Sequence, residues 1–420
     1  MFSIIKFPAP STFKQIGTRP TLDSHSLDAL IKDVFDQVKA TGDEALRELT
    51  LKFENKQLTN IAYTQEEIDE QAKLVPQELQ DAIQVAYRNI YVFHDSQKLV
   101  EKRIETSPGV VCWQKSSAIE RVGIYIPGGT APLFSTILML AIPAQIAGCK
   151  EIVLCTPGEH PALFYAAKLC GVTQMFRIGG SQAIAAMAQG TESVPAVYKI
   201  FGPGNQYVTA AKMFANRLGV AIDMPAGPSE VAVFADESAN PAFIASDLLS
   251  QAEHGHDSQV VLISTSESIL NQSIEAIKSQ VAELPRKDFA ASSLKNSQFI
   301  LLKSNEEAID LLNEYAAEHL ILACEDAEDF ADKITNAGSI FLGHFTPESA
   351  GDYASGTNHT LPTNGFAKAY SGVNLDSFVK KITLQAISKA GLEKIGPSII
   401  QMAEAESLQA HANAVKIRLS

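Results

Sequence analysis

The first quarter of the chain carries apolar residues at helical spacing. Apolar side chains recur three and four positions apart at Leu30, Ile31, Val34, Phe35 and Val38. This spacing is typical of an amphipathic helix. Thr64 and Glu67 have the spacing of a capping box, which marks the start of a further helix. A helical segment is therefore predicted from about residue 24 to residue 105.

From about residue 117 the pattern changes to short apolar runs that alternate with segments of helical length. The runs predicted to be strands are Val122–Ile126, Glu151–Cys155, Met175–Ile178 and Tyr198–Phe201. The segments predicted to be helices are Leu133–Ala147, Pro161–Leu169, Ser181–Ala188 and Asn205–Leu218. Strands that alternate with helices in this way form a parallel sheet covered by helices.

A second series of the same kind follows. Its predicted strands are Glu230–Phe234, Val260–Ser264, Gln298–Leu302 and Gly338–Phe341, with a helix at Pro241–Ala252. The fold class is therefore predicted to be α/β, with two parallel-sheet domains. We assign residues 24–116 and 235–375 to the first domain and 117–234 to the second, after an N-terminal segment, 1–23.

The last segment, residues 376–420, has the pattern of amphipathic helices. An amphipathic helix needs a surface on which to bury its apolar face. This tail is too small to form a core of its own, so it must pack on its own chain or on a neighbouring subunit. The pattern leaves both arrangements open.

Composition narrows the classes of function. The 420 residues are 46% hydrophobic and carry a net charge of -14, which makes nucleic acid an unsuitable partner. An anionic small ligand stays compatible with this charge, because helix N-termini bind anions. Five scattered cysteines, no signal-peptide pattern and no apolar run of membrane-spanning length predict a cytoplasmic protein outside the membrane.

Several histidines lie beside carboxylates or amides, as in a metal-assisted enzyme. Gln251 and His254 are three positions apart at the end of a predicted helix, so they share one face. Asp352 and His359 lie in or near a loop rich in Gly, Ser and Asn, and His411 is near the C-terminus. Mixed nitrogen and oxygen ligands suit zinc, but also manganese or cobalt.

Glu318 and His319 are neighbours at a predicted helix end. Both side chains are natural general bases. Adjacent helical residues point about 100° apart, so the two serve one site only if the helix ends there or if they flank the reacting atom.

Three polar side chains stand beside Gly-rich turns that follow predicted strands: Tyr125, Gln182 and Asn205. Such turns lie at the carboxyl edge of a parallel sheet, where open α/β folds bind ligands. None of the turns is a GxGxxG fingerprint, so the turns alone leave nucleotide binding open.

Taken together, the segments resemble histidinol dehydrogenase over nearly the whole chain. The matching stretches are Glu120–Gly129, Ile200–Asn205, Met224–Glu230, Gln251–Gly255, Glu318–Leu320 and Glu404–Glu406. The resemblance implies two incomplete Rossmann-like domains in a homodimer whose C-terminal segments cross to the partner. It also implies oxidation of L-histidinol through an aldehyde to L-histidine, the last step of histidine biosynthesis, with two NAD molecules reduced.

The resemblance also implies roles for individual residues. The zinc ligands would be Gln251, His254, Asp352 and His411. The acid–base pair would be Glu318 and His319. Substrate would contact Ser229, His359 and Glu406, together with Gln251, His254, His319, Asp352 and His411. NAD would contact Tyr125, Gln182 and Asn205.

Two other functions remain as alternatives. The missing GxGxxG fingerprint fits a zinc hydrolase that uses Glu318 to activate water without a nucleotide. A catalytically silent protein that binds imidazole ligands is the other, although intact acid–base candidates argue against it. His256 is close to His254 but lies beyond a glycine, and we interpret it as a surface turn residue.

Overall fold

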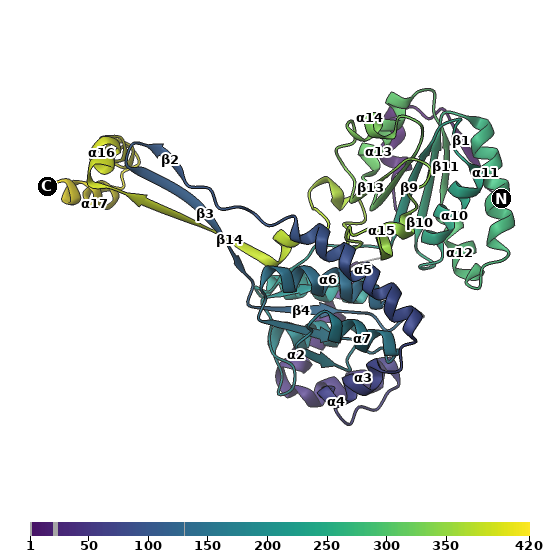
Figure 1. The fold of residues 1–420 in the computed structure, drawn as a ribbon, viewed down its shortest axis with the longest axis horizontal. Coiled ribbons are helices and arrows are strands. Elements are labelled where there is room, and N and C mark those ends of the chain that lie inside the picture. Colours follow the sequence, from purple (N-terminus) through teal and green to yellow (C-terminus); the bar gives the residue numbers. More distant parts are fainter. Residues whose placement is uncertain (1, 20–23, 130) are drawn as a thin grey trace.

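The computed structural model describes residues 2–19, 24–129 and 131–420. It contains two α/β units and a long arm that projects away from them (Figure 1). Each unit is built on a parallel sheet, which confirms the predicted fold class. In the part of the chain that the structure describes, every helix is too short or too polar to span a bilayer.

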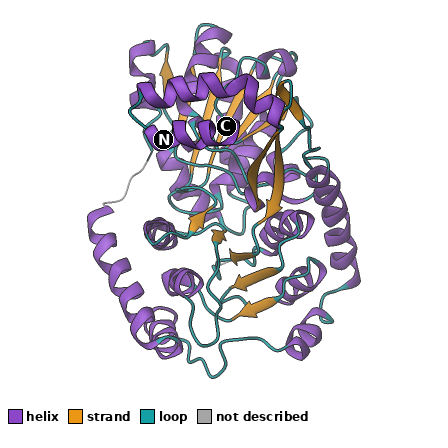
Figure 2. Ribbon diagram, turned by 90° about the vertical axis from the view of Figure 1, so that its left-hand side faces the viewer, coloured by secondary structure: helices purple, strands orange, loops and turns teal. Residues whose placement is uncertain are grey.

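The first sheet has five parallel strands in the order β6-β5-β4-β7-β8. Its strands are β4 (Arg121–Tyr125), β5 (Glu151–Cys155), β6 (Gln174–Phe176), β7 (Lys199–Phe201) and β8 (Ala221–Ile222). The helices between them are α6 (Phe134–Ala147), α7 (Pro161–Leu169), α8 (Gly180–Gln189) and α9 (Gln206–Arg217). Helices lie on both sides of this sheet (Figure 2).

The second sheet has six parallel strands in the order β1-β11-β10-β9-β12-β13. These are β1 (Ile4–Lys6), β9 (Glu230–Ala235), β10 (Gln259–Ser264), β11 (Gln298–Leu301), β12 (His319–Ala323) and β13 (Ser339–Leu342). Its helices are α1 (Phe13–Ile16), α10 (Pro241–Ala252), α11 (Glu267–Val281), α12 (Lys287–Ser293), α13 (Asn305–Tyr315), α14 (Ala327–Ala331) and α15 (Glu348–Tyr353). Short 3-10 turns are η1 (Pro10–Thr12), η2 (Leu294–Asn296), η3 (Phe366–Lys368) and η4 (Leu375–Phe378).

The N-terminal helices pack on the five-stranded sheet, so our assignment of 24–116 to the domain of 235–375 is wrong. The helices are α2 (Ser24–Thr41), α3 (Asp43–Glu54), α4 (Gln65–Ala72) and α5 (Gln77–Asp95). Val34 of α2 shares a core with Val153 of β5, and Ile90 of α5 shares one with Val122 of β4. Within the N-terminal segment, β1 pairs with β11 and so joins the other unit.

The arm is a three-stranded antiparallel ribbon that ends in two helices. It consists of β2 (Ile104–Ser107), β3 (Val110–Ala118), β14 (Val379–Ile387), α16 (Lys389–Ala405) and α17 (Gln409–Leu419). The prediction that 376–420 is helical is therefore wrong for β14. That strand pairs with β3 over its whole length, and neither of its faces is regularly buried. Without a buried face there is no apolar alternation to mark a strand.

Asn358 connects the two α/β units. It lies in the loop after α15, and its amide Nδ2 donates to the carbonyl oxygen of Met139 in α6 at 2.6 Å. The same nitrogen lies 3.3 Å from Nε2 of the buried His94 in α5. These bonds tie the loop of one unit to two helices of the other.

Phe378 joins the base of the arm to the five-stranded sheet. Its ring is fully buried and stacks on Phe201 with centroids 4.2 Å apart.

We expect Phe378→Ala to lower the free energy of unfolding by about 3–5 kcal/mol, because it leaves a cavity. Urea denaturation followed by circular dichroism measures this. Leu74→Ala, at a 62% exposed site, is the control and should change stability by less than about 0.5 kcal/mol. Equal losses in the two variants would contradict the role of Phe378 in joining the arm to the sheet.

Candidate active site

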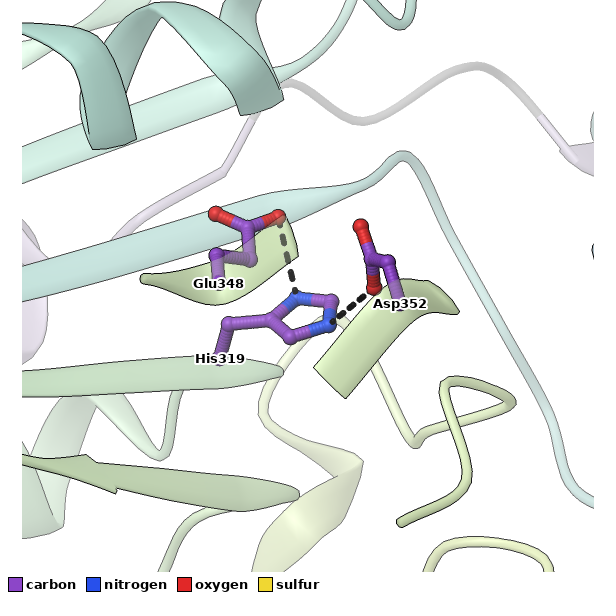
Figure 3. Close-up of side chains that lie close together, drawn as sticks. All are labelled: His319, Glu348 and Asp352. Atoms are coloured by element: carbon purple, nitrogen blue, oxygen red, sulfur yellow. Dashed lines mark ion pairs between the residues drawn. The ribbon is translucent and has the colours of Figure 1, made fainter. Parts of the chain in front are cut away.

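A cluster of ionisable side chains surrounds His319 (Figure 3). His319 Nδ1 lies 3.7 Å from Glu318 Oε2 and 3.7 Å from Glu348 Oε1. His319 Nε2 lies 3.5 Å from Asp352 Oδ1. The imidazole thus has carboxylates on both sides.

The cluster lies at the amino edge of the six-stranded sheet. His319 is the first residue of β12 and pairs with Val231, near the start of β9. Our prediction of a helix end at Glu318 and His319 is therefore wrong. Helix α13 ends earlier, at Tyr315, because Ala316 adopts a left-handed conformation with φ 53°. Alanine rarely adopts this conformation, so the sequence carries no stop signal there.

Gln251 reaches the cluster from the last turn of α10. Its Nε2 lies 3.2 Å from His319 Nδ1 and 3.4 Å from Glu318 Oε2. Its buried Oε1 has no hydrogen-bond partner. His254, two residues past the end of α10, is solvent-exposed and interacts electrostatically with Asp352 and His319.

His359 also lies beside the cluster. Its Nδ1 is 2.8 Å from the backbone oxygen of Asp352, and its Nε2 is 3.0 Å from Thr136 Oγ1 in α6. Ser229 is half-buried immediately before β9, at the same sheet edge. His256 is exposed, and its ring stacks on Phe289, so it has a packing partner away from the cluster.

Glu406 and His411 are not brought to the cluster within one chain. Glu406 is the C-cap of α16, His411 lies in α17, and both are exposed. These two helices form the far end of the arm, well separated from the six-stranded sheet (Figure 1).

Burial and mutual charge shift the titration of the cluster. Burial raises the pKa of Glu318 to about 8. For His319, burial acts to lower the pKa, but Glu348 and Glu318 outweigh it and raise the pKa to about 10. Burial also raises the pKa of Glu348. Burial opposes ionisation of Asp352 too, yet the neighbouring His319 ring, 3.5 Å away, leaves its pKa lowered. The protonation of His319 and that of the surrounding carboxyls therefore depend on one another.

The same side chains fit a divalent cation. Ligand atoms of His319, Glu348 and Asp352 lie within 4.8 Å of one another. Buried atoms without a hydrogen-bond partner include Gln251 Oε1, His319 Nε2 and both carboxylate oxygens of Glu348. Buried polar atoms are normally paired, so these orphaned nitrogen and oxygen atoms fit zinc or manganese.

Sequence reasoning missed Glu348. It is fully buried in the first turn of α15, one helical turn before Asp352. The spacing of four positions puts the two carboxylates on one helix face. The sequence therefore contained a signal for Glu348, namely its spacing of four positions from Asp352.

The predicted nucleotide contacts gather at the carboxyl edge of the five-stranded sheet. Tyr125 is the last residue of β4, and its hydroxyl accepts a hydrogen bond from the Gly180 backbone N–H at 3.0 Å. Gln182, in the first turn of α8, donates to Glu54 at 3.0 Å, while its buried Oε1 has no partner. Asn205 caps α9 by accepting from two backbone N–H groups. Sequence reasoning did not single out Glu54.

Comparison with known proteins identifies the family. A family model described as histidinol dehydrogenase matches residues 17–419. The chain belongs to the histidinol dehydrogenase family. The chain is 57% identical to the histidinol dehydrogenase of Bacteroides thetaiotaomicron, over 100% of this chain and 99% of the relative. It is 50% identical to that of Escherichia coli strain K12, over 97% and 95% of the two chains.

The family assignment agrees with a solved structure. The crystal structure of histidinol dehydrogenase from Elizabethkingia anophelis superposes with a TM-score of 0.97 at 54% identity, covering 100% of this chain and 98% of that one. An acetylating aldehyde dehydrogenase from Geobacillus thermoglucosidasius, 16% identical with a TM-score of 0.50 over 86% of this chain and 97% of that one, shares the fold alone.

The two buried carboxyls beside His319 should respond oppositely to neutralisation in EDTA-treated protein. The raised pKa of Glu348 means that its contribution to stability is lost as pH rises above its unfolded value of 4.5. The lowered pKa of Asp352 means that its contribution is present above 3.8 and lost as pH falls through the folded value. At pH 7, Glu348→Gln should therefore raise the melting temperature by several degrees and Asp352→Asn should lower it.

Scanning calorimetry at pH 7 and again near pH 4 measures both differences. Each should shrink at the lower pH, where both carboxyls approach protonation in the unfolded chain. Shifts of the same sign at pH 7 would contradict the charge assignment of the cluster.

Proposed function

We propose that this chain is a zinc- and NAD-dependent enzyme that oxidises L-histidinol twice, through histidinal, to L-histidine, as the last step of histidine biosynthesis. The observation that carries the proposal is the buried pair Glu318 and His319, set beside orphaned ligand atoms in a member of this family. An acid–base pair adjoining a metal-ligand set suits removal of a hydroxyl proton while hydride leaves the neighbouring carbon.

His319 would be the base in the first oxidation. Hydride leaves the alcohol carbon as the hydroxyl proton is removed, so the imidazole must be neutral when substrate is bound. Gln251, His254 and Asp352, with His411 of the partner subunit, would hold zinc and leave His319 free as the base. The bound ion would supply positive charge that lowers the pKa of nearby groups, and positions for the substrate. Because the Gln251 side-chain amide and the Asp352 carboxylate lie 3.2 and 3.5 Å from the His319 ring, substrate held between them would meet the base directly.

Glu318 would act in the second oxidation. The aldehyde must first add water, because its hydrogen can leave as hydride only from the tetrahedral carbon of the hydrate. A carboxylate with a raised pKa near 8 suits removal of the water proton at neutral to mildly alkaline pH. Ser229 and His359, together with Glu406 of the partner subunit, would hold the substrate.

NAD would bind at the carboxyl edge of the five-stranded sheet, at Tyr125, Gln182 and Asn205. Support comes from the unpartnered Oε1 of Gln182 and from the place of all three residues at this edge. Few contacts and no GxGxxG fingerprint suit a cofactor that leaves and is replaced while the aldehyde stays bound.

A homodimer completes the proposal. The arm carries Glu406 and His411 far from their own chain's cluster, and its apolar side chains include the 66% exposed Met402 and the 73% exposed Ile417. A second copy would cover this surface. We also place the enzyme in the cytoplasm, for which the five free cysteines are the support.

Purified protein with zinc, NAD and L-histidinol should produce NADH, with two NADH for each histidine formed. Absorbance of NADH and chromatography of histidine measure the ratio. EDTA treatment should abolish turnover, and zinc should restore it. Absence of NADH at every pH would refute the proposal, and hydrolysis of an ester or amide without NAD would favour the zinc hydrolase.

Complementation tests whether the site is shared between subunits. His319→Asn and His411→Ala should each lose most activity alone. When the two are mixed and refolded, half of the dimers are mixed and have one intact site of two, so about a quarter of wild-type activity should return. Each variant refolded alone is the control, and no gain on mixing would show that each subunit builds its own site.

A further inference from the structure

Arg19 makes an ion pair with Glu230 next to the cluster. The guanidinium Nε donates to Glu230 Oε2 at 2.5 Å, and Nη2 donates to Oε1 at 2.8 Å. Nη2 also donates to the Tyr315 backbone oxygen at 2.7 Å, and the guanidinium lies 3.9 Å from the centroid of the Tyr315 ring. The two side chains are 10% and 2% exposed. The Arg19 fork therefore fixes both oxygens of Glu230.

Glu230 in turn is bonded twice to Glu318. The Glu230 backbone N–H donates to Glu318 Oε2 at 2.9 Å. The Glu318 backbone N–H donates to Glu230 Oε1 at 3.3 Å. One bond holds the Glu318 carboxylate, and the other holds the backbone that carries it. A chain of contacts therefore runs from Arg19 through Glu230 to Glu318.

This arrangement is more than packing requires. A buried ion pair is often no more stabilising than apolar residues of the same volume. What apolar residues could not provide is the pair of hydrogen bonds between Glu230 and Glu318. Such contacts fix a carboxylate within the narrow range of positions that proton transfer demands.

We propose that Arg19 and Glu230 are positioning residues that hold the Glu318 carboxylate for hydration of the aldehyde. The inference rests on the function proposed above. In the hydration step, water oxygen bonds to the aldehyde carbon, one water proton passes to Glu318, and the carbonyl oxygen takes the proton that His319 accepted in the first oxidation, which gives the hydrate. The hydrate carbon then loses hydride to NAD, and a hydroxyl proton returns to the neutral His319, which leaves the carboxylic acid of histidine. A displaced Glu318 slows hydration and leaves the first oxidation intact.

The test is the double variant Arg19→Met/Glu230→Met. It removes both charges together, so no buried charge is left unpaired and the fold is retained. With histidinol as substrate we expect kcat for histidine formation to fall about 10- to 100-fold, with KM for histidinol nearly unchanged. Aldehyde should escape before its oxidation, so the ratio of NADH to histidine should rise above two.

A second two-point ion pair, whose side chains are 31% and 30% exposed, provides the control. Arg121 and Glu151 also form a two-point ion pair, on the five-stranded sheet and away from the cluster, at 2.8 and 2.6 Å. Arg121→Met/Glu151→Met should leave kcat and the ratio of two unchanged. A loss of packing alone would lower the stability of the Arg19→Met/Glu230→Met protein without changing its ratio of NADH to histidine.

Arg19→Lys keeps the positive charge but loses the two-point contact with the Glu230 carboxylate. This variant can be tested in place of the double variant if the double variant does not fold. It should give a kcat between that of wild type and that of the double variant, and a ratio above two. Wild-type kcat and a ratio of two in a folded Arg19 variant would overturn the inference. Failure of the wild-type protein itself to make NADH would refute the proposed function instead.

Discussion

Four ionisable side chains share a buried space at the starts of β9 and β12: Glu318, His319, Glu348 and Asp352. Their charges are balanced only in part, because three carboxyls face one imidazole. Burial therefore raises the pKa of Glu318 and Glu348, and the carboxyls raise that of His319. A cluster of this kind is costly unless a cation or a ligand completes it, so it links the stability of the unit to its chemistry.

The surrounding structure supports that cluster from two directions. On one side, Arg19 and Glu230 hold Glu318. On the other, the loop after α15 is tied to the second unit by Asn358 and His359, which contact helices α5 and α6. The cofactor that we propose would lie on that second unit, at the carboxyl edge of its sheet. The loop thus connects the acid–base cluster to the unit that would carry NAD.

The arm explains why a single chain is incomplete for the proposed reaction. Its ribbon has little apolar surface buried within the chain, and its helices carry Glu406 and His411 to the far end of the molecule. The dimer proposal rests on Glu406 and His411, which are exposed, lie far from the cluster of their own chain, and belong to a segment that matches the family. In the proposed dimer, the partner's tail would both stabilise the arm and supply site residues.

The sequence by itself determined the α/β class and most strand–helix alternation, and it gave α10 its bounds of Pro241–Ala252. It also singled out Gln251, Glu318, His319 and Asp352, because local motifs carry residue type and spacing. Only the tertiary structure decided that α2 to α5 cover the five-stranded sheet, that His319 begins a strand, and that Glu348 and Arg19 adjoin the cluster. The physical reason is the separation along the chain between the residues that make contact. Periodicity reports which face of an element is buried, whereas the partner of that face, and the charge beside a given imidazole, depend on contacts between residues distant in the chain.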